Sequence, residues 1–455
     1  MSIWSLAVYL LLLLLLLLLL LLMKLAPLTL GASVKPGEGR EAPELICKPS
    51  ALADHLLRSC RTFSGGGGSG RWTRLWPDLQ TLWNGVCPVA GGSLEFAREH
   101  LQMSDQGLVA LDWAVLGAGA GGAAAAARSR RRGPTTPPPP LPSGSILLIV
   151  PNALGRLTRN LCALCALALR RGYSPVLFNR RCHNSCPLTT RKLQPFGEPS
   201  DLREAVGYIR HRHPAAKLYA VSEGTGSGLL LSYLGECGSS SNMIAAACIS
   251  PVFSCRDWYE TGPPQLYHWL MVLYQKTNLS RYATVLSEVM DTEKLFRSSS
   301  LREMEEVIFC QSKTSSSSWE SYWEKNDPLR DVDEVAVPLL CICSKDDSCR
   351  GKPEQTLPFE LFETNPYFFL LLTERGGHCG FLTSSSSCWS HEALLEYFKS
   401  VSEFFRAEER TKSVYRRKGS VPPAYKHRGI TIHKREVLCS HNIHEIFNWQ
   451  RSYTR

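Results

Sequence analysis

The chain carries little net charge outside one terminal segment, which limits the kinds of partner it can have. Residues 411–455 hold ten Lys and Arg against two Glu, and so supply +8 of the formal net charge of +10. The rest of the chain is therefore close to neutral, and the basic character belongs to a tail. We predict no nucleic-acid partner.

The sequence also lacks the paired cysteine clusters of a zinc site or a disulfide framework. Its 17 Cys are odd in number, and many lie in apolar runs such as LLCIC and NLCALCALAL. That placement fits small buried side chains in a reducing compartment. The cluster CHNSC (Cys182, His183, Cys186) has no partner cluster at zinc spacing. We predict no metal and no cofactor.

A third absence concerns the N-terminus. No basic residue precedes the apolar run from Leu6 to Met23, and no A-x-A cleavage site follows it. In a helix this run would span about 27 Å, enough for a bilayer core. The first charge, Lys24, follows the run, so the positive-inside rule places the body on the cytoplasmic side. We therefore predict that residues 1–24 form a transmembrane anchor in the endoplasmic reticulum or a related membrane.

The alternative is a cleaved signal segment and a secreted protein. Only in that case would the sequon at Asn278 be available for glycosylation.

Composition divides the rest of the chain into a linker, a large domain and a tail. We predict a linker over 25–74, an α/β domain over 75–405 and a basic tail over 406–455. Residues 117–144 are low in complexity and predict a disordered insert. Two alternating runs on either side of Asp105-Gln106-Gly107 predict a hairpin.

From residue 145 onward, strands that are apolar on both faces alternate with helices. This pattern predicts an α/β fold with a mostly parallel, doubly wound sheet. Residues 251–330 interrupt the alternation with Trp-rich and Tyr-rich helical sequence. They predict a helical cap over the C-terminal edge of the strands, where ligands bind in open sheets. The predicted strands are SILLIV, SPVLFN, KLYAVS, MIAAACIS, VPLLCICS and PYFFLLLT.

The segment LYAVSEGTGSGLLLSYLGE predicts a buried strand, a sharp glycine turn and a helix. Together with the later VPLLCICSKDD and GGHCGF, it resembles the YheT-like group of membrane-anchored α/β-hydrolases, which are lipid hydrolases. Their nucleophile turn is G-x-S-x-G, and their triad follows in the order Ser, Asp, His. The resemblance covers about residues 75–405 apart from the insert. It implies an α/β-hydrolase fold with a helical cap insertion.

The resemblance also implies a role for each matching residue. Aligning the turn with G-x-S-x-G puts Gly224, which has no oxygen for attack, in the nucleophile slot. Asp347 matches the triad acid and His378 the triad base. The backbone amides of Ala153 and Thr225 match the donors of the oxyanion hole.

Two serines near the slot are alternative nucleophiles. Ser222 fits an elbow that turns two residues earlier, which is a displacement of roughly 6–7 Å along a strand. Ser227 lies in the first turn of the predicted helix and fits a capping residue. A dinucleotide site at GTGSG is a further alternative, but G-x-G-x-G does not match the spacing G-x-G-x-x-G.

Three functions stay open on these observations. The leading hypothesis is a membrane-tethered pseudo-hydrolase that binds a lipid or acyl-ester ligand or a protein partner, and that regulates lipid metabolism without cleaving esters. The second is a serine lipase or esterase with an atypical elbow at Ser222. The third is a protein-interaction adaptor regulating lipolysis, in which the basic tail and its aromatic segment EIFNWQRSYTR contact a partner or anionic lipid.

Overall fold

The computed structural model describes residues 42–64, 77–78, 80–81, 94–116, 144–313, 317–382 and 388–418. Within these ranges no helix is long and apolar enough to cross a membrane. The predicted anchor at 1–24 lies outside the described residues, as do nearly all of the insert at 117–144 and the tail after Lys418. What the sequence predicts for those segments stays a prediction.

A single mixed sheet organises the described part of the chain, in the order β1-β9-β8-β7-β6-β4-β5-β3-β2. The six strands from β4 to β9 run parallel, and β1, β2 and β3 are antiparallel to their neighbours. The strands are β1 (Glu44–Ile46), β2 (Leu94–Gln102), β3 (Leu108–Leu116), β4 (Ser145–Val150), β5 (Tyr173–Asn179), β6 (Lys217–Glu223), β7 (Ala245–Ile249), β8 (Leu339–Ser344) and β9 (Phe368–Thr373).

Helices cover both faces of this sheet, because the parallel strands are apolar on both sides. In β6, for example, Leu218 and Ala220 belong to one core, and Tyr219 and Val221 belong to the other. The first face is covered by α7 (Ser200–Arg212), α8 (Ser227–Cys237) and α16 (Phe359–Thr364). The second is covered by α2 (Ala51–Ser59), α3 (Arg61–Ser64), α6 (Arg159–Arg170) and α17 (Trp389–Lys418). The predicted doubly wound α/β fold is confirmed.

The hairpin predicted around Asp105-Gln106-Gly107 is also present, formed by β2 and β3. Gln106 lies in the left-handed region with φ +66°. The Asp105 side chain accepts a hydrogen bond from the Gly107 amide at 2.9 Å, which closes the turn.

Two predicted boundaries are wrong. The linker predicted over 25–74 contains β1, which pairs with β9 and forms one edge of the sheet, and α2, which buries Leu52 and Leu56 in the core. The Ser50 side chain caps α2 by accepting from the Ala53 amide, a start signal that the sequence carries. At the other end, α17 runs on to Lys418, so the tail predicted from 406 begins inside a helix.

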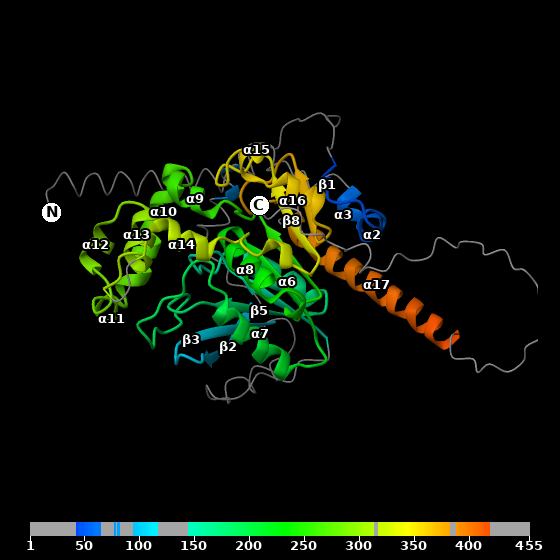
Figure 1. Cartoon of the computed structure of the whole chain (residues 1–455), viewed down its shortest axis with the longest axis horizontal. Coiled ribbons are helices and arrows are strands. Elements are labelled where there is room, and N and C mark those ends of the chain that lie inside the picture. Colours follow the sequence, from blue (N-terminus) through cyan, green and yellow to red (C-terminus); the bar gives the residue numbers. More distant parts are fainter. Residues whose placement is uncertain are drawn as a thin grey trace, which may run out of the picture. The chain divides into compact units, whose positions relative to one another are not determined.

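The cap forms between β7 and β8 and has a core of its own. Its helices gather on one side of the sheet, away from α17 (Figure 1). Their shared core is rich in aromatic side chains, among them Trp258, Tyr259, Trp319, Tyr322 and Trp323. The helices are α9 (Cys255–Thr261), α10 (Gln265–Ser280), α11 (Ala283–Leu286), α12 (Thr292–Arg297), α13 (Leu301–Phe309) and α14 (Trp319–Asn326).

One carboxyl group in this cap core should make the stability of the protein depend on pH. Burial raises the pKa of Glu305 to about 7, although the hydrogen bond from the Tyr322 hydroxyl and the Arg180 charge oppose the shift. A raised pKa favours the folded state at low pH and disfavours it once the buried group must ionise.

We expect wild type to lose about 3 kcal/mol of unfolding free energy relative to Glu305→Gln as the pH rises from about 4.5 to about 7. Urea unfolding of both proteins across this range measures the difference. Glu293→Gln, on an exposed side chain of α12, is the matched control. A difference between wild type and Glu305→Gln that does not change with pH would contradict the expectation.

Candidate functional site

The turn after β6 has the geometry of a nucleophile elbow. The strand ends at Glu223, a single 3₁₀ turn covers Gly224–Gly226, and α8 follows directly. Gly224 has φ +53°, in the left-handed region where a residue with a side chain is strained. A Cβ on Gly226 would lie 2.2 Å from the Pro151 carbonyl oxygen, so this position requires glycine for close approach to the next loop.

Gly224 faces the ring of His378. A Cβ atom on Gly224 would lie 2.9 Å from His378 Nε2 and 4.0 Å from Cys379 Sγ. A side chain at position 224 would therefore point at the imidazole nitrogen that takes a proton in a hydrolase triad. The 2.9 Å separation is also too short for a real Cβ, so the imidazole occupies part of the space that a nucleophile would need.

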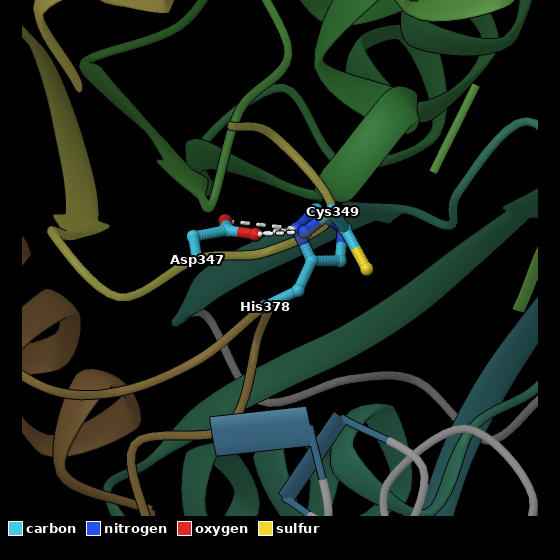
Figure 2. A group of neighbouring side chains, drawn as sticks. All are labelled: Asp347, Cys349 and His378. Atoms are coloured by element: carbon cyan, nitrogen blue, oxygen red, sulfur yellow. Dashed lines mark hydrogen bonds and ion pairs between the residues drawn. The ribbon is translucent and has the colours of Figure 1, made fainter. Parts of the chain in front are cut away.

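Asp347 and His378 form a hydrogen-bonded pair (Figure 2). Asp347 follows β8 and His378 follows β9, and the two Asp347 oxygens lie 3.0 and 3.2 Å from His378 Nδ1. The Asp347 carboxylate is fully buried; burial acts to raise its pKa, but the charges of His378 and Arg350 and its hydrogen bonds hold the pKa below the ordinary value. An ionised Asp347 would keep the proton on Nδ1 and leave Nε2 as the basic nitrogen toward Gly224.

The neighbouring acid, Asp346, has a different partner set. Its Oδ1 accepts from the amides of Gly376 and Gly377, both at 2.9 Å, and so fixes the loop that carries His378. Burial raises the pKa of Asp346. Of the two consecutive acids, only Asp347 is hydrogen-bonded to the imidazole among the described contacts.

The two predicted oxyanion residues also lie together, in an arrangement that the sequence does not predict. The Ala153 amide donates a hydrogen bond to the Thr225 hydroxyl at 3.0 Å. A hydroxyl therefore takes the place where an oxyanion would accept from Ala153. If Ala153 belonged to an oxyanion hole, the Thr225 hydroxyl would compete for its amide.

The alternative serines both lie away from this arrangement. Ser222 is 1% exposed, and its hydroxyl contacts Cys248 Sγ at 3.2 Å on the sheet face covered by α8. Ser227 is fully buried at the start of α8, where its hydroxyl accepts from the Val252 amide at 3.2 Å. Neither side chain lines the cavity next to His378.

Glu223 is a polar residue of this site that sequence reasoning missed. Its carboxylate is buried and accepts from the Asn160 amide group at 2.6 Å and from the Thr158 hydroxyl at 3.2 Å. Burial raises its pKa, against the effect of these two donors and of the His378 charge. The sequence did carry a signal for it, since Glu223 is an acidic residue at the end of an otherwise apolar strand. A carboxylate buried there needs hydrogen-bond donors, which marks the position as a polar site.

A small cavity lies between the elbow and the cap. Its volume is about 40 Å³, room for only a few water molecules and far below the roughly 300 Å³ of ordinary ligand pockets. An acyl ester cannot enter it without movement of the cap. Its lining comprises Thr81, Asn152, Thr158, Glu223, Gly224, Thr225, Trp258, Tyr267, Met271, His378 and Cys379.

Asp347, Cys349 and His378 also present potential metal-ligand atoms within 4.8 Å of one another, the one such group among the described residues (Figure 2). The donor set does not suit a cation. Burial raises the pKa of the Cys349 thiol, which disfavours the thiolate that a metal needs. The buried Arg350 guanidinium lies 3.8 Å from Asp347 Oδ2 and already supplies positive charge. The proximity follows from the acid–imidazole pair, and we assign no metal to it.

Comparison with known proteins shows an extensive similarity to one human protein. No protein-family profile matches the chain. It is 55% identical over 412 residues to Protein ABHD15 of Homo sapiens, covering 90% of this chain and 85% of the human protein. It is 29% identical over 219 residues to Phospholipase ABHD3 of Mus musculus, covering 46% of this chain and 52% of the mouse protein.

Similarity to solved structures is more distant. A Pyrococcus furiosus esterase matches 63% of this chain and 83% of its own, with 13% identity and a TM-score of 0.37.

The geometry at position 224 predicts the effect of adding one carbon atom. Gly224→Ala should lower the unfolding free energy by about 1–2 kcal/mol, since a Cβ is strained at positive φ and must also displace His378. Gly207→Ala in α7 is the matched control, because a Cβ there meets nothing within 4 Å. It should stabilise the protein by up to about 1 kcal/mol. Equal stability changes for the two variants in urea unfolding would contradict the assigned geometry.

Proposed function

This chain belongs to the ABHD15 family of α/β-hydrolases, and from that membership we propose that it acts in lipid metabolism as a regulatory pseudo-hydrolase. The membership itself agrees with the prediction from the sequence motifs and is confirmed by the 55% identity to the human protein. In the proposed role, the domain binds a lipid-like ligand or a protein partner and does not cleave esters.

The observation that carries the proposal is the glycine at position 224. It lies opposite His378 Nε2, the atom that would activate a nucleophile, and it offers no oxygen. In subtilisin, a hydrolase with the same kind of triad, removing the triad serine costs about 10⁶ in kcat. A loss of that size leaves no useful rate of ester turnover.

The Thr225 hydroxyl supports the proposal independently. It accepts the hydrogen bond of the Ala153 amide, one of the two amides that the resemblance assigns to the oxyanion hole. Losing one such donor typically costs 10² to 10³ in kcat, or about 3–4 kcal/mol of transition-state stabilisation. The two changes affect different parts of the acyl-transfer machinery, so reversing one would not restore the other.

The ligand class rests on relatives and is part of the proposal. The mouse relative is named a phospholipase, and a second relative, from Saccharomyces cerevisiae, is named a medium-chain fatty acid ethyl ester synthase/esterase. Both names point to acyl esters. The membrane anchor at 1–24, a protein partner and the adaptor role of the tail stay predictions beside it.

A serine-directed fluorophosphonate probe tests the absence of a nucleophile. We expect no labelling of detergent-solubilised wild type, and no difference from wild type in Ser222→Ala, Ser227→Ala or His378→Ala. Thermal unfolding of each sample checks that the protein is folded. The proposal would be contradicted if wild type were labelled and the labelling disappeared in both Ser222→Ala and His378→Ala. That result would support the esterase with a displaced elbow.

A second experiment asks whether the two changes act independently. Gly224→Ser combined with Thr225→Val should react with the probe, because valine keeps the shape of threonine and frees the Ala153 amide. Gly224→Ser alone should react about 10² to 10³ times more slowly. Thr225→Val alone is the control and should stay unlabelled. Equal rates for the single and double serine variants would show that the Thr225 hydrogen bond has no part in inactivity.

A further inference from the structure

The outer face of α10 presents a row of large apolar side chains. Leu266, Trp269 and Leu273 are 60%, 60% and 47% exposed, and their spacing of three and four residues places them on one side of the helix. Within the described residues, the other large hydrophobic side chains with comparable exposure are Leu57 and Leu116, on separate elements. Single exposed apolar residues are ordinary, but three in register form a patch.

The opposite face of the same helix closes the cavity. Tyr267 and Met271 line it together with His378 and Glu223, and Met271 and Val272 are buried in the cap core. The exposed row and the roof of the cavity are therefore two sides of one helix. Anything that binds the row contacts the element that would have to move for a ligand to enter.

The charges around the row favour an anionic partner. The 22 residues from Gln265 to Leu286 include Lys276 and Arg281 and contain no Asp or Glu. The Arg156 guanidinium lies 5.7 Å from the centre of the Tyr274 ring, on the C-terminal half of α10. Acidic charge does reach the helix from α13, where the pKa of Glu303 is lowered chiefly by the hydrogen bond from the Ser299 amide and, to a smaller degree, by the charge of Lys276.

An apolar row with Trp and Leu, cations beside it and no acid on its own helix is the composition of a helix that lies in a bilayer interface. Trp in particular favours the headgroup level of a membrane, because its ring is amphipathic. A protein groove for an amphipathic helix would also accept Leu and Trp, but it gives no reason for the excess of cations along the helix.

We propose that the outer face of α10 docks on an anionic lipid surface through Leu266, Trp269 and Leu273. In this contact α10, which closes the cavity, lies against the membrane. This surface is separate from the predicted N-terminal anchor, and the proposal does not depend on whether the cavity hydrolyses anything.

The test uses the full chain with vesicles that contain a photoactivatable lipid, in either phosphatidylserine-rich or purely phosphatidylcholine membranes. After irradiation, mass spectrometry locates the lipid adducts. The predicted apolar segment Leu6–Met23 is unchanged in all variants, so its adducts serve as an internal reference for recruitment.

We expect adducts on peptide 265–280 in phosphatidylserine-rich vesicles, and a drop of about tenfold or more in the triple variant Leu266→Ser, Trp269→Ser, Leu273→Ser. Leu116→Ser, a change of an exposed leucine at the end of β3, is the matched control and should leave α10 labelling unchanged. The altered side chains are exposed, so thermal unfolding should be the same in all variants.

Equal labelling of peptide 265–280 in wild type and the triple variant would overturn the proposal. Equal labelling in the two membranes would overturn the assignment of an anionic surface. A third outcome is that lipid adducts form only on Leu6–Met23 while α10 is cross-linked to a second protein. That result would show that Leu266, Trp269 and Leu273 form a protein interface and not a lipid-binding surface.

Discussion

The hydrogen bond between Asp347 and His378 is the interaction on which the arrangement of this site depends. It joins the loops after β8 and β9, and a buried carboxylate can stay ionised there because the imidazole, Arg350 and two backbone amides surround it. Removing any of these partners would leave buried charge without compensation. The pair therefore has a structural role that does not require catalysis. The intact geometry of Asp347 and His378 is consequently weak evidence for activity, and the atoms opposite Nε2 decide the question.

Opposite Nε2 lies an elbow that carries Gly224 and has three polar or steric features around it. The imidazole reaches into the space above Gly224, the Thr225 hydroxyl accepts from the Ala153 amide, and the Glu223 carboxylate lines the cavity beside them. Each feature alone could be a local variation. Together they differ from a site that stabilises developing negative charge, because this site holds a buried acid and the Ala153 amide donates to a hydroxyl. Because burial raises the pKa of Glu223 and so favours its neutral form, repulsion of an oxyanion or a fatty carboxylate would arise only where Glu223 is ionised.

The sequence predicts the parts of this protein in which local pattern and global fold agree. The strand SILLIV matches β4 at both ends, and the loops after β8 and β9 carry Asp347 and His378 to one edge because parallel strands end together. Prediction from the sequence fails where the deciding contacts join residues far apart in the chain. β1 is three residues long and depends on its pairing with β9. α17 extends into the tail because most residues of AEERTKSVYRRK, positions 407–418, are good helix formers. The bond from Ala153 to Thr225 joins residues 72 positions apart, which no spacing rule anticipates.

The size of the cavity connects the elbow to the cap. At about 40 Å³ it cannot admit a lipid, so any lipid-like ligand must bind a state in which Tyr267 and Met271, and with them α10, have moved. A surface that binds the outer face of α10 would have different affinities for the closed and the open cap. Binding of the ligand and binding of the surface would then be coupled. Each would change the affinity of the domain for the other by the same factor. In the proposed regulatory role, the domain would then report the presence of a lipid through the position of one helix.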